Sequence, residues 1–166
     1  MLYSIDVGAK GMTSNFIKRR DDLTADFMDT SPMLTTLLLG AAAGSQRLYA
    51  NIDVLKPGAK SAKMHSHSLQ EEFFLVLKGD GTLRVNDQEY AVKAGDCFAK
   101  PAGQQIAHQF INTSNDLLEI LDVGIPDPND EIFYPDDDVL YSRTNKKAFK
   151  NGNDISELWS SDPNQS

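Results

Sequence analysis

The stretch Met64–Gly79, MHSHSLQEEFFLVLKG, decides the fold of this chain and carries its most distinctive chemistry. Two of the three histidines of the protein, His65 and His67, lie here one residue apart. In an extended strand, side chains at positions i and i+2 leave the same face, so both imidazoles can point at one spot. Imidazole nitrogens suit zinc, copper, iron and nickel, and a carboxylate such as Glu71 or Glu72 widens the choice to manganese. The stretch therefore predicts a metal site on a strand.

Short strands separated by turn residues surround this stretch. Glycine and proline pairs or triplets recur at short, regular spacing, and no long helical pattern interrupts them. The eight expected strands are Arg47–Lys56, Lys63–His67, Glu72–Leu77, Thr82–Val85, Glu89–Val92, Cys97–Ala99, Ala107–Asn112 and Leu117–Val123. This rhythm is typical of an all-β sandwich or barrel.

The two ends of the chain have a different character from the region 47–124, which we expect to be the β-barrel domain. Residues 1–46 are expected to form an N-terminal arm with one strand, Leu34–Leu39, and a solvated basic surface at Lys18–Arg20. Residues 125–166 are expected to form a C-terminal extension. Its prolines and the run Asp136–Asp138 predict an irregular tail, with calcium binding by that run as a minor alternative. Asp154–Trp159 could form a short helix, and the ring of Trp159, the only tryptophan, is expected to pin the tail to the body.

Composition narrows the class of protein. The chain has 166 residues, 40% of them hydrophobic, which is enough for one real core. Its formal net charge of −8 argues against a nucleic-acid groove, which requires a basic stripe. No apolar run approaches the ~20 residues that cross a bilayer, and no secretion signal is evident. A single cysteine, Cys97, fits a reducing compartment, so we expect a cytoplasmic protein without a membrane partner. Cys97 itself is expected to be a small buried hydrophobe.

The histidines and the glutamate lie in two sequence motifs that are marked by glycines. The first is Gly58-x6-His65-x-His67-x4-Glu72-x6-Gly79, and the second is Gly95-x5-Pro101-x-Gly103-x4-His108-x3-Asn112. Together they resemble the two signature motifs of the cupin superfamily. The resemblance covers about Arg47–Val123 and implies a double-stranded β-helix, or jelly roll, with a metal at its centre.

The resemblance also implies the ligand set. In that family the two histidines and the glutamate of the first motif, with the histidine of the second, hold the metal. Here these are His65, His67, Glu72 and His108. One extra residue before His65 and two before His108 depart from the family pattern, but both insertions fall in turns, where length is tolerated. We expect one divalent ion, Mn, Fe, Ni or Zn.

The choice between the two glutamates rests on spacing. In one unbroken strand Glu71 would share the face of the histidines, but Ser68–Gln70 reads as a bend. The six-residue gap to Gly79 matches the family pattern only from Glu72. Phe74 and Val76 should then face inward beside it. The outward residues Phe73, Leu75 and Leu77 would need cover, either from the arm or from a second subunit, and we expect a homodimer.

Three functions fit such a site. The first is a metal-dependent enzyme, of the oxygenase or isomerase type, acting on a small molecule that is anionic or enolic. The second is a non-enzymatic module that binds or senses a small ligand. The third is a structural dimer whose metal ties strands together. An isomerase would also need a general base, for which Tyr49 and Gln109 are only candidate pocket residues.

Overall fold

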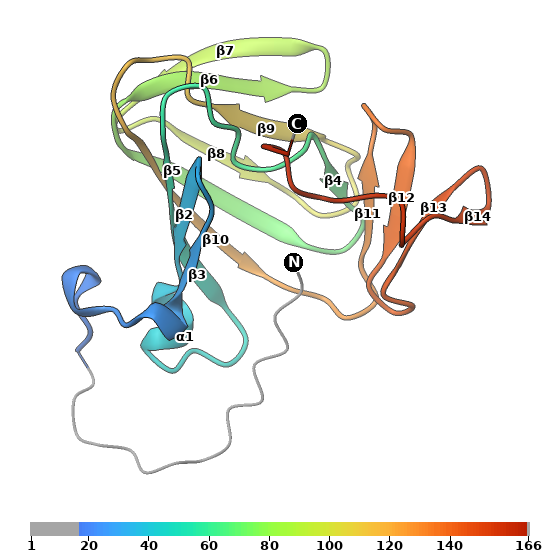
Figure 1. Ribbon diagram of the computed structural model, residues 1–166, viewed down its shortest axis with the longest axis horizontal. Coiled ribbons are helices and arrows are strands. Elements are labelled where there is room, and N and C mark those ends of the chain that lie inside the picture. Colours follow the sequence, from blue (N-terminus) through green and yellow to red (C-terminus); the bar gives the residue numbers. More distant parts are fainter. Residues whose placement is uncertain (1–16, 166) are drawn as a thin grey trace.

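The computed structural model describes residues 17–165, which fold almost entirely into antiparallel strands (Figure 1). In chain order the elements are η1 (Arg20–Asp22), η2 (Ala25–Phe27), β1 (Met28–Thr30), β2 (Leu34–Leu37), α1 (Leu39–Ala42), β3 (Tyr49–Leu55), β4 (Ser66–His67), β5 (Glu71–Lys78), β6 (Asp80–Val85), β7 (Gln88–Lys93), β8 (Cys97–Lys100), β9 (His108–Ile111), β10 (Leu118–Ile125), β11 (Glu131–Tyr134), β12 (Val139–Ser142), β13 (Lys147–Lys150) and β14 (Asn153–Asp154). Strands β3 to β10 confirm the eight strands expected from the sequence, and with them the all-β fold class.

The strands form two facing layers. One layer is a six-stranded sheet in the order β1-β2-β3-β10-β5-β8. The other consists of the three-stranded sheet β7-β6-β9 and the five-stranded sheet β14-β13-β12-β11-β4. An antiparallel bridge between His65 and His108 links the segment before β4 to β9, so the two smaller sheets adjoin at the histidines. The result is the jelly roll that the sequence predicted.

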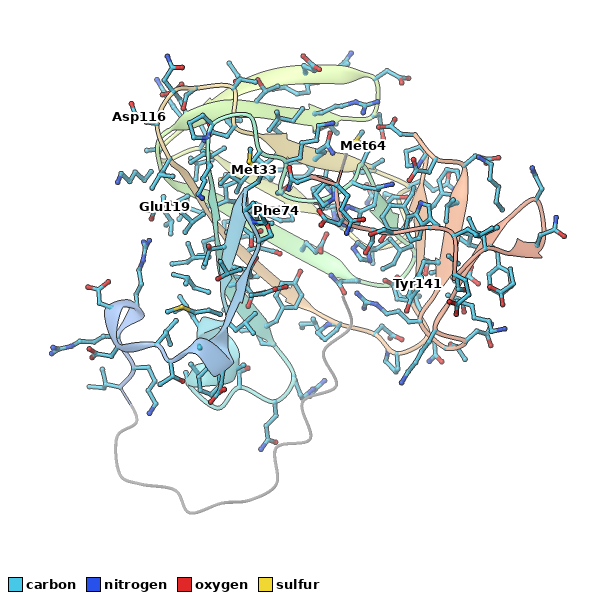
Figure 2. The ribbon with its side chains drawn as sticks, viewed as in Figure 1. Met33, Met64, Phe74, Asp116, Glu119 and Tyr141 are labelled. Carbon is cyan, nitrogen blue, oxygen red and sulfur yellow. The ribbon has the colours of Figure 1, made fainter. Side chains whose placement is uncertain are left out.

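The core lies between these layers. The largest buried cluster consists of Leu55, Ala59, Phe74, Val76, Leu83, Phe110, Leu118 and Ile120. Strand β5 contributes its alternate residues, and Figure 2 labels Phe74 among the side chains of this region. Phe73 and Leu77 point the other way and are 42% and 40% exposed, which confirms the two-faced strand expected from the sequence.

A glycine makes the tight connection between β5 and β6. Gly79 adopts a φ of +80°, in the left-handed region that a side chain rarely allows. A Cβ atom at this position would also lie only 2.4 Å from the carbonyl oxygen of Leu117. The close approach of the chain before β10 therefore requires glycine at this turn.

The C-terminal extension is more ordered than its sequence indicated. Strand β11 pairs with β4, placing Ile132 opposite His67, and β12 to β14 follow as further antiparallel strands (Figure 1). The prolines and aspartates that predicted an irregular tail lie in the turns between these strands. Ile132, Tyr134, Val139 and Ala148 form a second small core within the extension, against which Trp159 packs. Trp159 was expected to pin the tail to the body, and Lys63 of the body lies over its ring, with Nζ 5.3 Å from the centroid.

Two expectations were wrong, and the minor alternative for the acidic run has no support. No helix forms at Asp154–Trp159, because the carboxylate of Asp154 accepts hydrogen bonds from the backbone and hydroxyl of Ser156 and holds a turn instead. Cys97 is exposed, because it faces outward at the start of the edge strand β8. In the acidic run, Asp136 pairs with Arg84 and Asp137 with Lys63, and no metal-binding group was found there within residues 17–165.

The N-terminal arm supplies two strands, β1 and β2, at one edge of the six-stranded sheet, where one strand was expected. Lys18–Arg20 is exposed, as expected, and Arg20 forms an ion pair with Glu119 of β10. Residues 1–16 of the expected arm lie outside the described part of the chain. Within residues 17–165, no helix is long and apolar enough to cross a membrane.

Candidate metal centre

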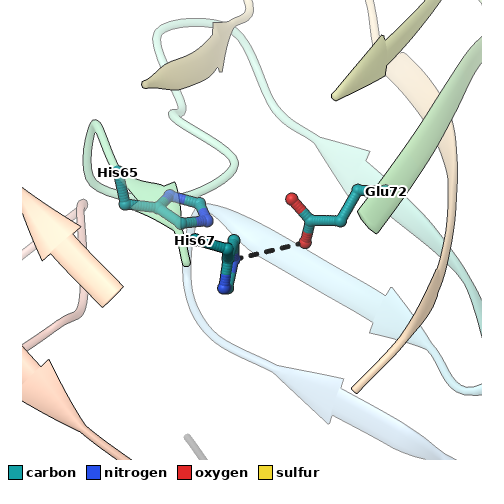
Figure 3. Close-up of side chains that lie close together, drawn as sticks. All are labelled: His65, His67 and Glu72. Atoms are coloured by element: carbon teal, nitrogen blue, oxygen red, sulfur yellow. Dashed lines mark ion pairs between the residues drawn. The ribbon is translucent and has the colours of Figure 1, made fainter. Parts of the chain in front are cut away.

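Three of the four expected ligands gather in one place. His65 and His67 extend from the same face of the segment that ends in β4, with ring centroids 4.9 Å apart. Their ligand atoms and one carboxylate oxygen of Glu72 all lie within 4.8 Å of one another (Figure 3). Figure 3 shows both rings turned toward the carboxylate, which comes from β5. In the described part of the chain, this is the one group of at least three such residues found.

The structure separates the two adjacent glutamates. Glu72 is 5% exposed and faces the histidines, whereas Glu71 is exposed on the other side of β5. The bend between β4 and β5 breaks the alternation that would otherwise have put Glu71 on the histidine face. Family spacing therefore selected the glutamate that points inward.

His108 lies beside this group. Its ring centroid is 4.7 Å from that of His65, and its Nε2 atom is 3.8 Å from Glu72 Oε2. The backbone bridge between His65 and His108 holds the two rings together across the two small sheets. All four expected residues are thus neighbours, although His108 falls outside the tight group of three.

Hydrogen bonds orient two imidazoles for metal binding. Nδ1 of His65 lies 2.7 Å from the carbonyl oxygen of Lys63, and Nδ1 of His67 lies 2.6 Å from Asp130 Oδ2. Because both partners accept, each Nδ1 of a neutral ring carries the proton, and each Nε2 presents a lone pair. Nε2 of His67 is buried without a hydrogen-bond partner. A lone pair buried in this way is costly, and a cation would satisfy it, so the residues fit a metal ion.

The pKa shifts of His65 and His108 also favour metal binding. Burial, followed by the nearby His67, lowers the pKa of His65 to about 4. Burial and the nearby His65 also hold the pKa of His108 well below its usual value. Both rings are therefore neutral at neutral pH, which is the form that binds metals.

Asp130, which orients His67, was missed by the sequence analysis. Its buried carboxylate also accepts hydrogen bonds from the Ser68 hydroxyl and from the backbone N–H of Leu69, at 3.1 and 2.8 Å. Burial alone would raise the pKa of Asp130, but the hydrogen bonds from His67 and Leu69 outweigh it and lower that pKa. Asp130 lies just before β11, 63 residues after His67, and nothing in its local sequence marked it as part of the site.

A polar group surrounds Glu72. Its Oε1 atom accepts hydrogen bonds from Gln70 Nε2 at 2.6 Å and from the Tyr49 hydroxyl at 2.9 Å. Its Oε2 atom lies 2.8 Å from Lys100 Nζ. Burial alone would raise the pKa of Glu72, but His67, His108 and Lys100 outweigh it and keep that pKa low. Tyr49, a candidate pocket residue from the sequence, therefore lies at the site, and the sequence analysis did not identify Lys100 or Gln70.

Gln109, the other candidate pocket residue, is directed elsewhere. Its side-chain amide donates a 2.6 Å hydrogen bond to the carbonyl oxygen of Ala62. It lines a pocket of about 240 Å³ with Lys60, Lys63, Met64 and residues of the C-terminal extension, among them Tyr134. The ring of Tyr134 packs against that of His65, with centroids 5.8 Å apart, so this pocket adjoins the histidine group.

A jelly roll that gathers histidines and a glutamate at its centre is the arrangement typical of a cupin. Comparison with known proteins agrees, because residues 51–124 match the cupin domain family. The chain belongs to the cupin superfamily.

The similar solved structures include two linked to sugar phosphates. A sugar phosphate isomerase of the cupin superfamily from Silicibacter pomeroyi is 30% identical, with a TM-score of 0.67 over 75% of this chain and 86% of that one. A candidate sugar phosphate isomerase from Acidithiobacillus ferrooxidans is 27% identical, with a TM-score of 0.67 over 75% of this chain and 76% of that one.

One similar curated protein is named for binding a dicarboxylate, oxalate. An oxalate-binding protein from Thermotoga maritima is 35% identical over 79 residues, which are 48% of this chain and 62% of that protein. The chain spans about three-fifths of the length of the curated relatives it matches, at 62% and 58%.

Proposed function

We propose that this protein binds one divalent metal ion through His65, His67, Glu72 and His108 and uses it to hold a small anionic molecule. The observation that carries the proposal is the buried Nε2 lone pair of His67, which has no hydrogen-bond partner and faces a carboxylate 3.4 Å away. Three nitrogen ligands and one oxygen ligand suit Mn, Fe, Ni or Zn. Such a set leaves coordination positions open for a ligand oxygen.

The ligand class is supported by charge and by the relatives. Three neutral imidazoles and one carboxylate around a dication leave a net charge of about +1, which attracts an anion. Oxalate and sugar phosphates, the ligands named for two similar proteins, are both anions with oxygen donors. A bound metal would act as a Lewis acid on such an oxygen.

Isomerisation of a sugar phosphate is the second candidate function. The solved structure that favours it shares 30% identity and is covered over 86% of its length. Tyr49 is the polar group beside Glu72 that could exchange a proton with a ligand. Burial and the charges of Asp122 and Glu72 raise the pKa of its hydroxyl, so Tyr49 acts as a donor and not as a base at neutral pH.

Metal analysis combined with calorimetry tests the proposal. The purified protein is expected to contain close to one equivalent of a divalent metal, and His67→Ala is expected to lose it. Leu158→Ala, at an exposed position, is the control and should keep its metal. Oxalate, and glucose 6-phosphate as a representative sugar phosphate, are then titrated into the loaded protein, and turnover of the sugar phosphate is assayed. A His67→Ala protein with full metal content would contradict the metal site, and a loaded protein that binds neither anion would contradict the ligand class.

We also propose that the protein is a cytoplasmic homodimer. The outer face of β5 presents Phe73, Leu75 and Leu77, and the neighbouring β8 presents Cys97 and Ala99 in register with it. An apolar face spread over adjacent strands is suited to a second copy of itself, since two-fold dimers bury the same patch on both subunits. The single cysteine supports a reducing compartment.

A further inference from the structure

A buried lysine lies at the metal centre. Lys100, the last residue of β8, is paired in register with Glu72 of β5, and both side chains point into the barrel. Lys100 is 1% exposed, and lysine is almost never buried to this extent unless it is paired. The motifs that revealed the four expected ligands gave no sign of this residue.

The ammonium group is only partly satisfied by its surroundings. In the described part of the chain its one ion pair is with Glu72 Oε2, at 2.8 Å. That contact occupies one of the three N–H donors of the ammonium group, and Nζ has no other hydrogen-bond partner among the described residues. Glu72, by contrast, has its other oxygen fully engaged by Tyr49 and Gln70. A lysine kept only to neutralise Glu72 would be expected to direct its other two donors at acceptors, but within the described residues these two donors are unused.

The position of Lys100 places it beside the proposed metal. Glu72 Oε2, the oxygen that contacts Lys100, is also the oxygen 3.8 Å from His108 Nε2. A metal held by Glu72 and the histidines therefore shares this carboxylate with the ammonium group. A small molecule coordinated next to Glu72 would come within reach of the unused donors of Nζ.

The charge of the pocket then selects a ligand class. A dication, the ammonium of Lys100 and the carboxylate of Glu72 sum to +2 when the three imidazoles bind the metal as neutral ligands. The carboxylate of Asp130, beyond His67, is paired with Arg143 at 3.6 Å. Burial and the charges of Glu72 and Asp53 raise the pKa of Asp122 well above its usual value, which favours its neutral form. The carboxylate of Glu72, 2.8 Å from Nζ, is the counter-charge that stabilises the ammonium of Lys100 in the pocket.

We infer that Lys100 is a ligand-binding residue that holds one anionic oxygen group of a dianion while the metal holds another. The inference rests on the proposed function and narrows it from a small anion to a dianion, either a dicarboxylate or a phosphate. It also separates this site from a purely structural metal, which would need no second cation.

Substitution of Lys100, with one matched control variant and two anions as probes, tests the inference. Lys100→Met removes the charge and keeps the volume, and Lys78→Met, on the exposed end of β5, is the matched control. Binding of Mn²⁺ is measured first, without any anion, and oxalate or inorganic phosphate is then titrated into the loaded protein. Lys100→Met is expected to bind Mn²⁺ at least as tightly as the unmodified protein, because a competing cation is gone. It should bind the anion about 10- to 100-fold more weakly, the loss of one charge-assisted contact. Lys78→Met should change neither affinity.

The outcomes separate the inference from the proposed function. If the unmodified protein does not bind Mn²⁺ or another divalent metal, the proposed function fails and the inference fails with it. If the metal binds but anion affinity in Lys100→Met equals that of the unmodified protein, the inference alone is overturned. A loss for oxalate but not for phosphate identifies a dicarboxylate, and the reverse identifies a phosphate. Lys100→Gln, which keeps a donor for Glu72, replaces Lys100→Met if that variant does not fold and is expected to show the same loss.

Discussion

At the scale of single residues, the proposed metal centre depends on groups outside its ligand set. Asp130 accepts a hydrogen bond from His67 and thereby sets which ring nitrogen is free. Carboxylates that orient a metal-binding histidine in this way raise its basicity and hold its ring in place. On the proposed function, residues of the C-terminal extension therefore contribute to the metal affinity of the site.

Replacing Asp130 should weaken metal binding without removing a ligand. Asp130→Asn loses the charged partner of His67 Nδ1, and we expect Mn²⁺ affinity to fall about 10- to 100-fold, measured by calorimetry. Asp138→Asn is the control, because Asp138 is exposed in a turn with a φ of 53° that asparagine also tolerates. Unchanged Mn²⁺ affinity in Asp130→Asn would show that Asp130 does not position His67.

A second carboxylate should make stability depend on pH. Burial, opposed by a hydrogen bond from Thr36 and reinforced by the charge of Asp29, raises the pKa of Asp53 to about 6. The folded protein therefore holds this proton more tightly than the unfolded chain. The resulting stabilisation is present below about pH 4 and is lost as pH rises through about 6.

Asp53→Asn removes this ionisation and should change the pH profile. The variant is expected to be more stable than the unmodified protein at pH 7.5, by on the order of 2 kcal/mol, and to gain little at pH 4. Asparagine keeps the oxygen that accepts the Thr36 hydrogen bond, so packing is preserved. Chemical denaturation at both pH values measures the difference, and an equal effect at both would contradict the raised pKa.

At the scale of elements, the C-terminal strands complete the sheet that carries the histidines. Strand β11 bonds to β4, which would otherwise be a two-residue strand at an open edge. Trp159 secures this addition, because its ring packs edge-on against Tyr134 at 4.7 Å and its Nε1 donates a 2.7 Å hydrogen bond to Asp137. Tyr134 in turn packs on His65, so the fastening reaches the metal centre.

Removing the tryptophan ring should loosen the extension. Trp159→Ala is expected to lower the free energy of unfolding by about 2 to 3 kcal/mol, somewhat less than for a fully buried ring, because Trp159 is only partly covered. Leu158→Ala provides the comparison, since Leu158 is adjacent but 89% exposed and should change stability very little. Equal effects of the two substitutions would show that Trp159 does not fasten the strands.

At the scale of the whole molecule, the barrel leaves one apolar sheet face without a described partner of its own chain. The described part of the N-terminal arm adds β1 and β2 beside β3 and contacts β10 through Arg20, and it leaves Phe73 and Leu77 exposed (Figure 1). The proposed dimer covers this face.

A charge on that face should separate the subunits. Phe73→Glu is expected to convert a dimer into a monomer in sedimentation at micromolar concentration, because two buried carboxylates would face each other across the two-fold axis. Tyr90→Glu, on the outer face of β7, should leave the dimer intact. A monomeric unmodified protein at the same concentration would contradict the proposed dimer.

The barrel and its inward glutamate could be predicted from the sequence because local physics controls them. Alternation along Phe73–Leu77 shows in the primary structure which residues face the core, and Gly79 marks a turn that requires a positive φ. The spacing around His65 and His67 indicated four residues that the structure brings together. These features depend on neighbouring residues along the chain and on the spacing of the family motifs. Both can be read from the sequence alone.

What only the tertiary structure decided is the environment of those four residues. Asp130 and Lys100 are brought to the site by closure of the sheets, across 63 residues from His67 and 28 from Glu72. The strands of the C-terminal extension could not be predicted from the sequence either, because the prolines and aspartates between them are also typical of an irregular tail. Contacts between distant segments depend on how whole sheets pack, and no local pattern carries that information.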